Sequence, residues 1–264
     1  MLAEWFTYLI TPCQKSFKQL GFLTELIGIK HRHQRCEKNW SPHLNACKNL
    51  IENAAQSAHG FDKAVILGSG LLLDIPIEAL SKRFKKVILV DICHLRKVRN
   101  IAKKYPNIEL IEIDISGTVD ALLAWNPSSN LPKPDPDLDV LNDADYVASA
   151  NLVAQLPLAP LHYLLKKAPK LSEMQREVYA KSIIDCHLKM LSDLKCTVTL
   201  ITEISSQISD GDRILEETVS LYGHVYHNIS NAWVWDLALR PEISPDYDLK
   251  LNIIGIPNLS AHPD

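Results

Sequence analysis

The sequence predicts an α/β fold with a mostly parallel sheet, helices on both faces, one antiparallel strand near the C-terminus and an N-terminal helical extension. Three observations lead to this prediction. Helical periodicity dominates residues 1–59, short apolar segments alternate with helical segments from residue 60 onward, and two strand-like segments follow one another directly near the end of the chain. Continuous apolar runs separated by helices are typical of a parallel sheet that is covered on both faces.

The first 59 residues are expected to form a helical cap. Apolar residues recur at helical spacing in two stretches between residues 20 and 54. Ser41 and Pro42 predict a helix start, because Ser is a common N-cap and Pro fits the first helical position. The basic run 30–38 has two interpretations, a solvated helix face or a cationic wall over an anionic ligand.

The remaining residues, 60–264, are expected to form one domain. Its expected strands are 64–67, 86–91, 108–114, 144–151, 197–204, 224–239 and 249–256, and its main expected helices follow residue 70 and cover 94–104, 172–194 and 212–222. Ser172 and Gln175 have the spacing of a capping box at the start of the third of these helices. The connection 241–248 is too short for a crossover helix, so the last two strands are expected to pair antiparallel.

Composition excludes several classes of protein. The chain of 264 residues has 28 Lys and Arg and 31 Asp and Glu, so its formal net charge is −3, and 47% of its residues are hydrophobic. This balance argues against wholesale disorder and against the broad basic field of a non-specific nucleic-acid binder. No apolar run reaches the roughly 18–20 residues of a membrane span. The sequence contains no aromatic Asn-Pro-Pro motif, so methylation of nucleic-acid bases has no specific support.

The six cysteines are scattered, and none forms a CxxC pair. Without paired ligand spacing they predict reduced thiols, no metal site and a cytoplasmic protein. A small-molecule substrate is the expected partner, and the pattern indicates no particular oligomeric state.

The turn Gly68-Ser69-Gly70 follows the first expected strand. Ligands of open α/β sheets bind outside the carboxyl ends of the strands, and glycine lets the backbone approach a ligand closely. The alternative is an ordinary strand–helix turn, since many such turns carry glycine.

Two acids close the next two expected strands. Asp91 lies 23 residues after Gly68, where a carboxylate can accept hydrogen bonds from both hydroxyls of a ribose. Asp114 closes the third strand, where it can accept from an adenine amino group, and Ile92 and Ile115 are placed to sandwich the flat base. For both acids the alternative role is a turn or a helix cap.

Together these features resemble the class I S-adenosylmethionine (SAM)-dependent methyltransferases, whose seven-stranded sheet is Rossmann-like. The resemblance covers residues 60–257. It implies SAM as cofactor, a glycine-rich loop at Gly68-Ser69-Gly70, and a reversed last strand at 249–256. It also implies a ribose acid, an adenine acid and a polar segment near the methionine moiety and the methyl group, matched by Asp91, Asp114 and Ser149-Ala150-Asn151 with Gln155 beyond it.

The sequence departs from the family pattern at two positions. Ile66 stands where the family usually has an acid, and Leu72 stands where it often has a third glycine. Asp74 is placed to supply a nearby acid for the methionine part of the cofactor, or alternatively to interact with the dipole of the following helix.

Two residues are candidates for catalysis of methyl transfer to a small molecule. His43 is a candidate general base if the N-terminal helices cap the site, the alternative being an exposed histidine in the first turn of a helix. Asn151 is a candidate for holding the acceptor by its amide, the alternative being a buried structural hydrogen bond. Trp233 and Trp235 alternate along a strand and should share one face, as core or as a wall for a flat acceptor.

Two other functions remain open from the sequence. A methyltransferase-like binding or scaffolding protein without catalysis is favoured by Ile66 and Leu72. A nicotinamide-dependent oxidoreductase is the third alternative, but its GxGxxG motif needs glycine at position 73, which is Leu73.

Overall fold

A computed structural model of the chain describes residues 2–227, 229 and 231–259. One sheet of eight strands runs in the order β3-β2-β1-β4-β5-β8-β7, with β6 pairing β5 from off this path. The strands are β1 (Lys63–Leu67), β2 (Lys86–Asp91), β3 (Ile108–Glu112), β4 (Tyr146–Ala150), β5 (Thr197–Asp210), β6 (Arg213–Val219), β7 (Asn231–Ala238) and β8 (Asp248–Ile256).

Strands β1 to β5 pair in parallel, and β8 lies antiparallel between β5 and β7. The predicted mostly parallel sheet with a reversed C-terminal strand, β8, is therefore confirmed, and β6 also pairs antiparallel with β5. Its physical basis is the short connection before β8, which leaves no room for the crossover that a parallel pairing needs.

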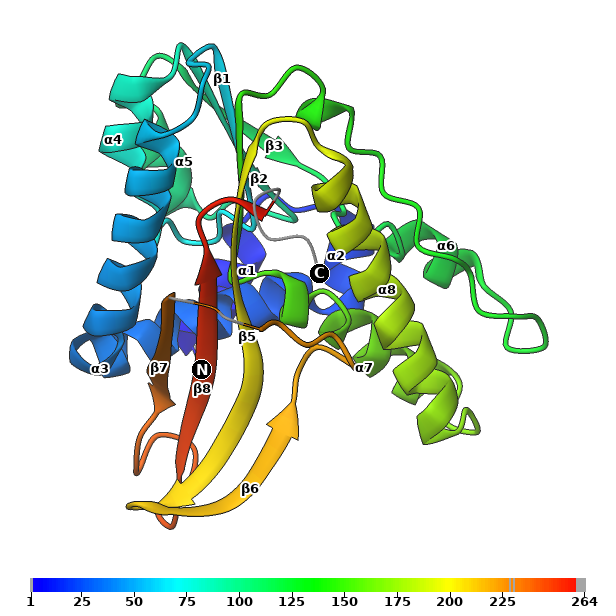
Figure 1. The fold of residues 1–264 in the computed structure, drawn as a ribbon. Helices are drawn as coiled ribbons and strands as arrows, with labels where there is room; N and C mark the ends of the chain where they lie inside the picture. Colours follow the sequence, from blue (N-terminus) through cyan, green and yellow to red (C-terminus); the bar gives the residue numbers. More distant parts are fainter. Residues whose placement is uncertain (1, 228, 230, 260–264) are drawn as a thin grey trace.

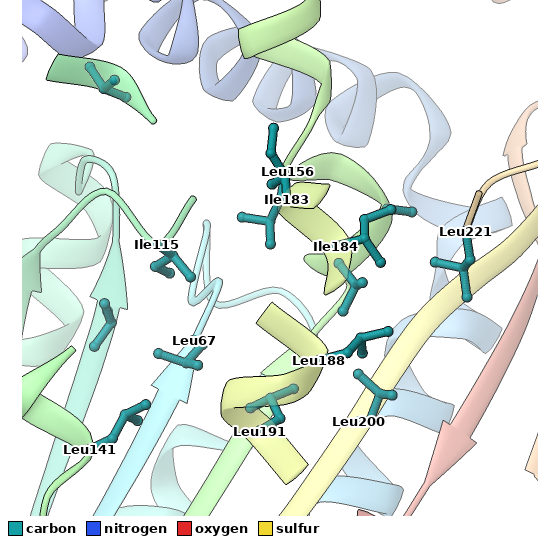
Figure 2. Packing of buried hydrophobic residues seen from close by; sticks show 14 of the residues in the cluster. Leu67, Ile115, Leu141, Leu156, Ile183, Ile184, Leu188, Leu191, Leu200 and Leu221 are labelled. Carbon is teal, nitrogen blue, oxygen red and sulfur yellow. The ribbon is translucent and has the colours of Figure 1, made fainter. Parts of the chain in front are cut away.

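Helices cover both faces of the sheet, as predicted (Figure 1). On one face lie the second half of α3 (Phe22–Gln56), α4 (Ile77–Arg83) and α5 (Arg96–Ala102), which pack on residues such as Ile66 and Leu89. On the other face lie α6 (Val119–Ala124), α7 (Leu158–Lys167) and α8 (Glu173–Asp193). Figure 2 shows Leu67 and Leu200 of the sheet facing Ile184, Leu188 and Leu191 of α8.

Helix α8 begins with the predicted capping box. The Ser172 hydroxyl accepts from Gln175 N, and the Gln175 side chain accepts from Ser172 N. These two bonds satisfy backbone donors that have no partner within the helix. The helix after the glycine turn begins only at Ile77, with Pro76 at its N-cap position, which is later than the sequence pattern indicated.

The predicted helix over 212–222 is wrong, because Arg213–Val219 is strand β6. Residues 211 and 212 join β5 to β6 as a two-residue hairpin loop between the paired residues Asp210 and Arg213, and Gly211 has a φ of +61°. A two-residue loop that starts with a positive-φ glycine is a favoured hairpin connection. The turn chemistry of Asp210-Gly211 was therefore the better guide to this segment than its helical spacing of apolar residues.

The predicted helix start at Ser41-Pro42 is also wrong, because α3 continues through Pro42. Pro42 and Lys38, whose carbonyl loses its helical hydrogen bond there, are both exposed, so water can take over that bond. Figure 1 shows α3 bending sharply between a first half that crosses the strand ends and a second half that runs along the sheet. Proline is the ordinary cause of such a bend.

The N-terminal helices lie over the carboxyl ends of the strands. Leu23, Leu26 and Ile27 of α3 form a small apolar cluster with Cys93 and Leu95, which follow β2. Helices α1 (Leu2–Ile10) and α2 (Lys15–Leu20) cross the same region (Figure 1). That residues 1–59 form a separate cap, with a domain boundary at residue 59, remains a prediction.

Candidate functional site

The strand order reverses direction between β1 and β4, and the loops that follow these two strands diverge from one point. Leu67 at the end of β1 is in register with Ser149 of β4. In an open α/β sheet such a switch point is where ligands bind, outside the carboxyl ends of the strands. The glycine turn and Asn151 are the first residues beyond these two strands, so the topology brings the predicted loop and polar segment together.

Gly68 and Gly70 have φ values of +76° and +50°, a conformation that favours glycine. A Cβ on Gly68 would lie 3.0 Å from the Ala150 carbonyl oxygen and from Leu152 Cβ, so close packing also requires glycine there. A Cβ on Gly70 would meet no atom outside the loop's own backbone, its nearest neighbour being Gly68 O at 3.8 Å. Gly70 therefore faces open space, as a residue that a ligand approaches should.

Leu72 has a φ of +60°, which is unusual for a bulky side chain. Its side chain is buried in the core between the sheet and α3. The loop thus keeps a glycine-like backbone at the position where the family often has its third glycine, and burial of the Leu72 side chain offsets the strain.

The Asp91 carboxylate is bound to the glycine turn. Its Oδ2 accepts from Gly70 N at 2.6 Å and its Oδ1 accepts from Ile92 N at 2.7 Å. The next helix, α5, has Leu95 at its N-cap, so the helix-cap alternative for Asp91 is wrong. The backbone N–H of Cys93 is a third donor to this carboxylate, so one of its roughly four acceptor positions remains for a ligand hydroxyl. Burial raises the pKa of Asp91 to about 6, against the lowering effect of the backbone N–H donors.

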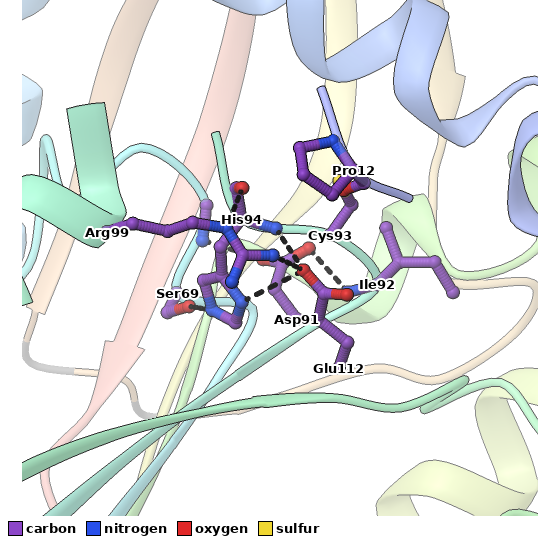
Figure 3. Close-up of polar contacts among 9 residues, drawn as sticks. Pro12, Ser69, Asp91, Ile92, Cys93, His94, Arg99 and Glu112 are labelled. Atoms are coloured by element: carbon purple, nitrogen blue, oxygen red, sulfur yellow. Dashed lines mark hydrogen bonds and ion pairs between the residues drawn. The ribbon is translucent and has the colours of Figure 1, made fainter. Parts of the chain in front are cut away.

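A second set of bonds ties the ends of β2 and β3 to the glycine turn (Figure 3). Glu112 accepts from His94 N at 2.9 Å and pairs with Arg99 at 2.5 Å, and Ser69 Oγ lies 3.2 Å from His94 Nε2. Burial lowers the pKa of His94 to about 4, so its ring is neutral at pH 7. Glu112 and His94 escaped the sequence analysis because neither ends an apolar strand in the expected register.

Asp114 has the alternative role that the sequence left open. Its Oδ1 accepts from Ser116 N at 3.0 Å and Ser116 Oγ at 2.6 Å, and its Oδ2 accepts from Thr118 N at 2.8 Å and Val119 N at 2.7 Å. These four bonds use the roughly four acceptor positions of a carboxylate and hold the turn that starts α6. An adenine amino group can bind Asp114 only if one of them is released. Ile115 beside it is buried.

On the β4 side of the switch point, the structure brings Asp74, Asn151 and His43 together. Asn151 has a φ of +50°, and its Nδ2 donates to Asp74 Oδ2 at 2.7 Å and lies 3.3 Å from His43 Nε2. Trp233 Nε1 donates to His43 Nδ1 at 3.0 Å, and the His43 ring is stacked on Trp235 with centroids 3.9 Å apart. His43 is thus neither exposed nor in a first turn, and both tryptophans share its face, as predicted.

The donor from Trp233 fixes the protonation of His43. An indole nitrogen only donates, so Nδ1 must keep its lone pair and the ring proton must lie on Nε2. Nε2–H faces Cys47 Sγ at 3.6 Å. Burial lowers the pKa of His43 to about 3. Neither ring nitrogen has a lone pair available here, so this arrangement disfavours the general-base role expected of His43.

Ser149 points to the opposite face of the sheet. Its hydroxyl lies 3.0 Å from Nε2 of His187 on α8, and both residues are buried. Burial lowers the pKa of His187 to about 4. The side chain of Ser149 therefore joins β4 to helix α8, while the side chain of Asn151 lies at the switch point.

A cavity of about 1000 Å³ lies at the amino ends of the strands, on the side of the sheet opposite the glycine turn. It is lined by residues that precede β1, β4 and β5, such as Gly60, Asp145 and Cys196, and it contains none of the predicted site residues. A smaller space near Asn151 is lined by Gln155, Glu203 and Trp235. Glu203 was missed because only the pairing of β5 with its neighbours brings it to this edge.

No helix in the described part of the chain is long and apolar enough to cross a membrane. No group of three or more His, Cys, Asp or Glu side chains there has an arrangement suited to a metal ion.

Solved structures of methyltransferases are similar to this chain in fold. They include DhpI in complex with SAH, at 12% identity over 86% of this chain and 93% of that chain, with a TM-score of 0.35. A SAM-dependent methyltransferase from Leishmania major has 12% identity over 80% and 71%, with a TM-score of 0.32. The Burkholderia thailandensis 1,6-didemethyltoxoflavin-N1-methyltransferase has 10% identity over 78% of both chains, with a TM-score of 0.32.

At these identities and TM-scores the likeness is one of fold alone. No protein-family model matches the chain, and no curated protein matches its sequence. The parallel strands β1 to β5 and the reversed β8 give the chain the fold that its resemblance to class I methyltransferases implied.

Proposed function

We propose that this protein is a SAM-dependent methyltransferase that acts on a small molecule. The observation that carries the proposal is the pair formed by Asp91 and the glycine turn at the switch point. A carboxylate that is held at the switch point by backbone N–H groups and keeps an acceptor position is suited to a ribose hydroxyl.

The residues present fit the cofactor at several points. Gly70 leaves the space that a ligand needs beside the loop, and Asp91 offers an acceptor for the ribose. Half-buried Ile92 supplies apolar surface for the adenine ring, whereas Ile115 is buried in the core, and Asp74 supplies a carboxyl group for the amino group of the methionine part. When bound, SAM supplies a methyl group on a positively charged sulfur.

The chain's own contribution is to position the acceptor and to exclude water. Methyl transfer is an in-line displacement, so orientation accounts for much of the rate enhancement. Helices α1, α2 and the first half of α3 cross the strand ends and cover the switch point. Asn151 is held in a positive-φ conformation with its amide nitrogen bound to Asp74, which fixes the direction of its oxygen.

Calorimetric titration with SAM and S-adenosylhomocysteine tests the proposal. Wild type should bind both, and Asp91→Ala should weaken binding at least about tenfold, because a charge-assisted hydrogen bond worth about 1.5–3 kcal/mol is lost and 1.4 kcal/mol corresponds to one decade. Asp120→Ala, an exposed acid on α6, is the matched control and should bind like wild type. Absence of binding at millimolar concentration would refute the proposal.

The same titrations separate the alternatives. Tight binding of SAM without methyl transfer to any acceptor would favour the binding or scaffolding function. Binding of NADH instead of SAM would favour the oxidoreductase, although the reversed strand β8 argues against it.

A further inference from the structure

Two cysteines from distant parts of the chain are in contact at the carboxyl ends of the strands. Cys13 lies in the short segment between α1 and α2, and Cys93 follows the end of β2, two residues after Asp91. The Cys93 thiol donates to the carbonyl oxygen of Pro12 at 3.5 Å, and the two cysteine side chains are hydrogen-bonded to each other. Figure 3 shows Pro12 beside Cys93. Both sulfurs are free thiols in this structure.

Apolar packing holds this pair of cysteines in place. Cys93 is fully buried in the small apolar cluster that α3 forms with the residues after β2, and Cys13 packs against the same cluster. Cys13 is only half-buried, so a small solute can reach its sulfur. Because the two side chains are already in contact, a bond between their sulfurs requires no large movement of either backbone segment.

Cys13 is the more reactive of the two thiols. Its hydrogen bond with Cys93 lowers the pKa of Cys13, against the raising effects of burial and of Glu112, and Lys18 lowers it further. All six cysteines lie in the described part of the chain, and the pKa of each of the other five is raised. The thiolate is the nucleophile in disulfide exchange, so Cys13 is the expected point of first attack.

The pair lies against residues of the proposed cofactor site. The backbone N–H of Cys93 donates to the carboxylate of Asp91, the proposed ribose acceptor. Ile92, the proposed adenine contact, packs on the same apolar cluster as Cys13. The segment that carries Cys13 joins α1 to α2, which cross the strand ends (Figure 1). A ligand that approaches Asp91 from this side must therefore pass that segment.

We propose that Cys13 and Cys93 form a reversible disulfide, which fastens the segment between α1 and α2 to the end of β2 and so restricts access to the switch point. With free thiols the contact consists of apolar packing and weak sulfur hydrogen bonds, so the segment can move away. With the disulfide the contact is covalent. The effect on cofactor exchange rests on the proposed methyltransferase function, whereas formation of the bond does not.

The oxidant is a small-molecule disulfide such as oxidised glutathione. The Cys13 thiolate attacks one of its sulfurs, which forms a mixed disulfide and releases one thiolate. Cys93 then gives up its proton, and its sulfur attacks Cys13 Sγ, which forms the new bond and releases the second thiolate. The protein loses two electrons and two protons, and the small molecule takes up both as two thiols. Excess reduced thiol reverses the exchange, as is typical of redox-sensing disulfides in reducing compartments.

Peptide mapping by mass spectrometry tests formation of the bond in the full-length protein. After incubation with oxidised glutathione, we expect the peptides that carry Cys13 and Cys93 to be linked and the protein to be lighter by two hydrogen atoms. Dithiothreitol should restore both thiols. Cys13→Ser and Cys93→Ser should form no such link. Cys186→Ser replaces another half-buried cysteine, on α8, and as the matched control it should form the link like wild type.

Two further measurements test whether the bond closes the site. Hydrogen exchange of the amides in α1 and α2 should be slower in the oxidised than in the reduced protein, with no cofactor present. Dissociation of S-adenosylhomocysteine, followed by stopped-flow tryptophan fluorescence, should be at least about tenfold slower in the oxidised protein. Cys93→Ser keeps a donor for Pro12 O and should dissociate like the reduced protein even with oxidised glutathione. Thermal melts confirm that each variant is folded.

The outcomes separate this inference from the proposed function. Absence of a bond between Cys13 and Cys93 after oxidation would overturn the inference, as would a bond that leaves hydrogen exchange of α1 and α2 or dissociation of S-adenosylhomocysteine unchanged. In each of these cases, binding of S-adenosylhomocysteine to the reduced protein would leave the methyltransferase function intact. A bond that slows hydrogen exchange in a protein that binds neither SAM nor S-adenosylhomocysteine would support the closure and refute the methyltransferase function.

Discussion

The indole Nε1–H of Trp233 donates to Nδ1 of His43 across 3.0 Å, between residues 190 positions apart in the chain. This bond places the imidazole proton on Nε2 and keeps His43 neutral inside the protein. It joins the bent helix α3 to the edge strand β7 directly beside the proposed site.

His43 should make the protein less stable in acid. Its folded pKa of about 3 lies below the usual value of 6.5, so between these pH values the unfolded chain binds a proton that the folded chain does not. Stability is therefore lost as pH falls below about 6.5, by up to ~1.4 kcal/mol per pH unit for one proton.

Urea unfolding of wild type and His43→Asn between pH 4.5 and pH 8 measures this contribution. Asn can still accept from Trp233 but does not titrate, so the stability of the variant should fall less steeply in acid by about one proton. Above pH 7 the two curves should run parallel. Identical slopes below pH 6.5 would show that His43 is protonated in the folded state.

Binding of S-adenosylhomocysteine should depend on pH through Asp91. The folded pKa of about 6 means that the carboxyl group is mostly ionised at pH 7 and mostly protonated at pH 5. Ribose hydroxyls donate to the ionised form, so affinity should fall by about tenfold between pH 7 and pH 5. Calorimetry on Asp91→Asn gives the control, which should bind weakly and without this dependence.

Replacement of Asp114 should affect folding more than cofactor binding. Asp114→Ala removes the acceptor of Thr118 N and Val119 N at the start of α6, for an expected loss of ~1–2 kcal/mol of unfolding free energy. Affinity for S-adenosylhomocysteine should stay within about threefold, which is under 0.7 kcal/mol. A loss of affinity beyond about tenfold with unchanged stability would instead assign Asp114 to the adenine.

At position 72 a glycine variant should be at least as stable as an alanine variant, which is the reverse of the usual order of stability. Leu72→Ala loses buried apolar surface and keeps the positive φ, whereas Leu72→Gly loses the same surface and relieves a strain of about 1–2 kcal/mol. The glycine variant should therefore be at least as stable as the alanine variant in urea unfolding. At Leu80, buried within helix α4, glycine should be less stable than alanine by about 1 kcal/mol.

Most of the parallel sheet could be predicted because its strands are buried on both faces and so appear as continuous apolar runs. The segment Arg213–Val219 was misjudged because its apolar residues are exposed and carry little information, and only the hairpin loop at Gly211 indicated a strand. Pro42 was misjudged because a local rule was applied to a helix whose two halves are held by packing against different parts of the fold.

At the site, residues that end strands could be predicted because parallel topology brings strand ends together. Asp91 and Asn151 belong to this class. The bond from Trp233 to His43 and the position of Glu203 could not be predicted, since they depend on contacts between distant segments and on the register of β8. The role of Asp114 stayed open because an acid at a strand end serves a turn as readily as a ligand.

The two halves of helix α3 pack against different parts of the fold. Its second half contributes Cys47, Ile51 and Ala54 to the core against the sheet, while its first half reaches over the strand ends. A chain shortened to begin at residue 60 would thus leave a hydrophobic face of the sheet in water and would aggregate. Residues 1–59 therefore should not behave as an independent module, because the helix that lies over the strand ends also packs on one face of the sheet.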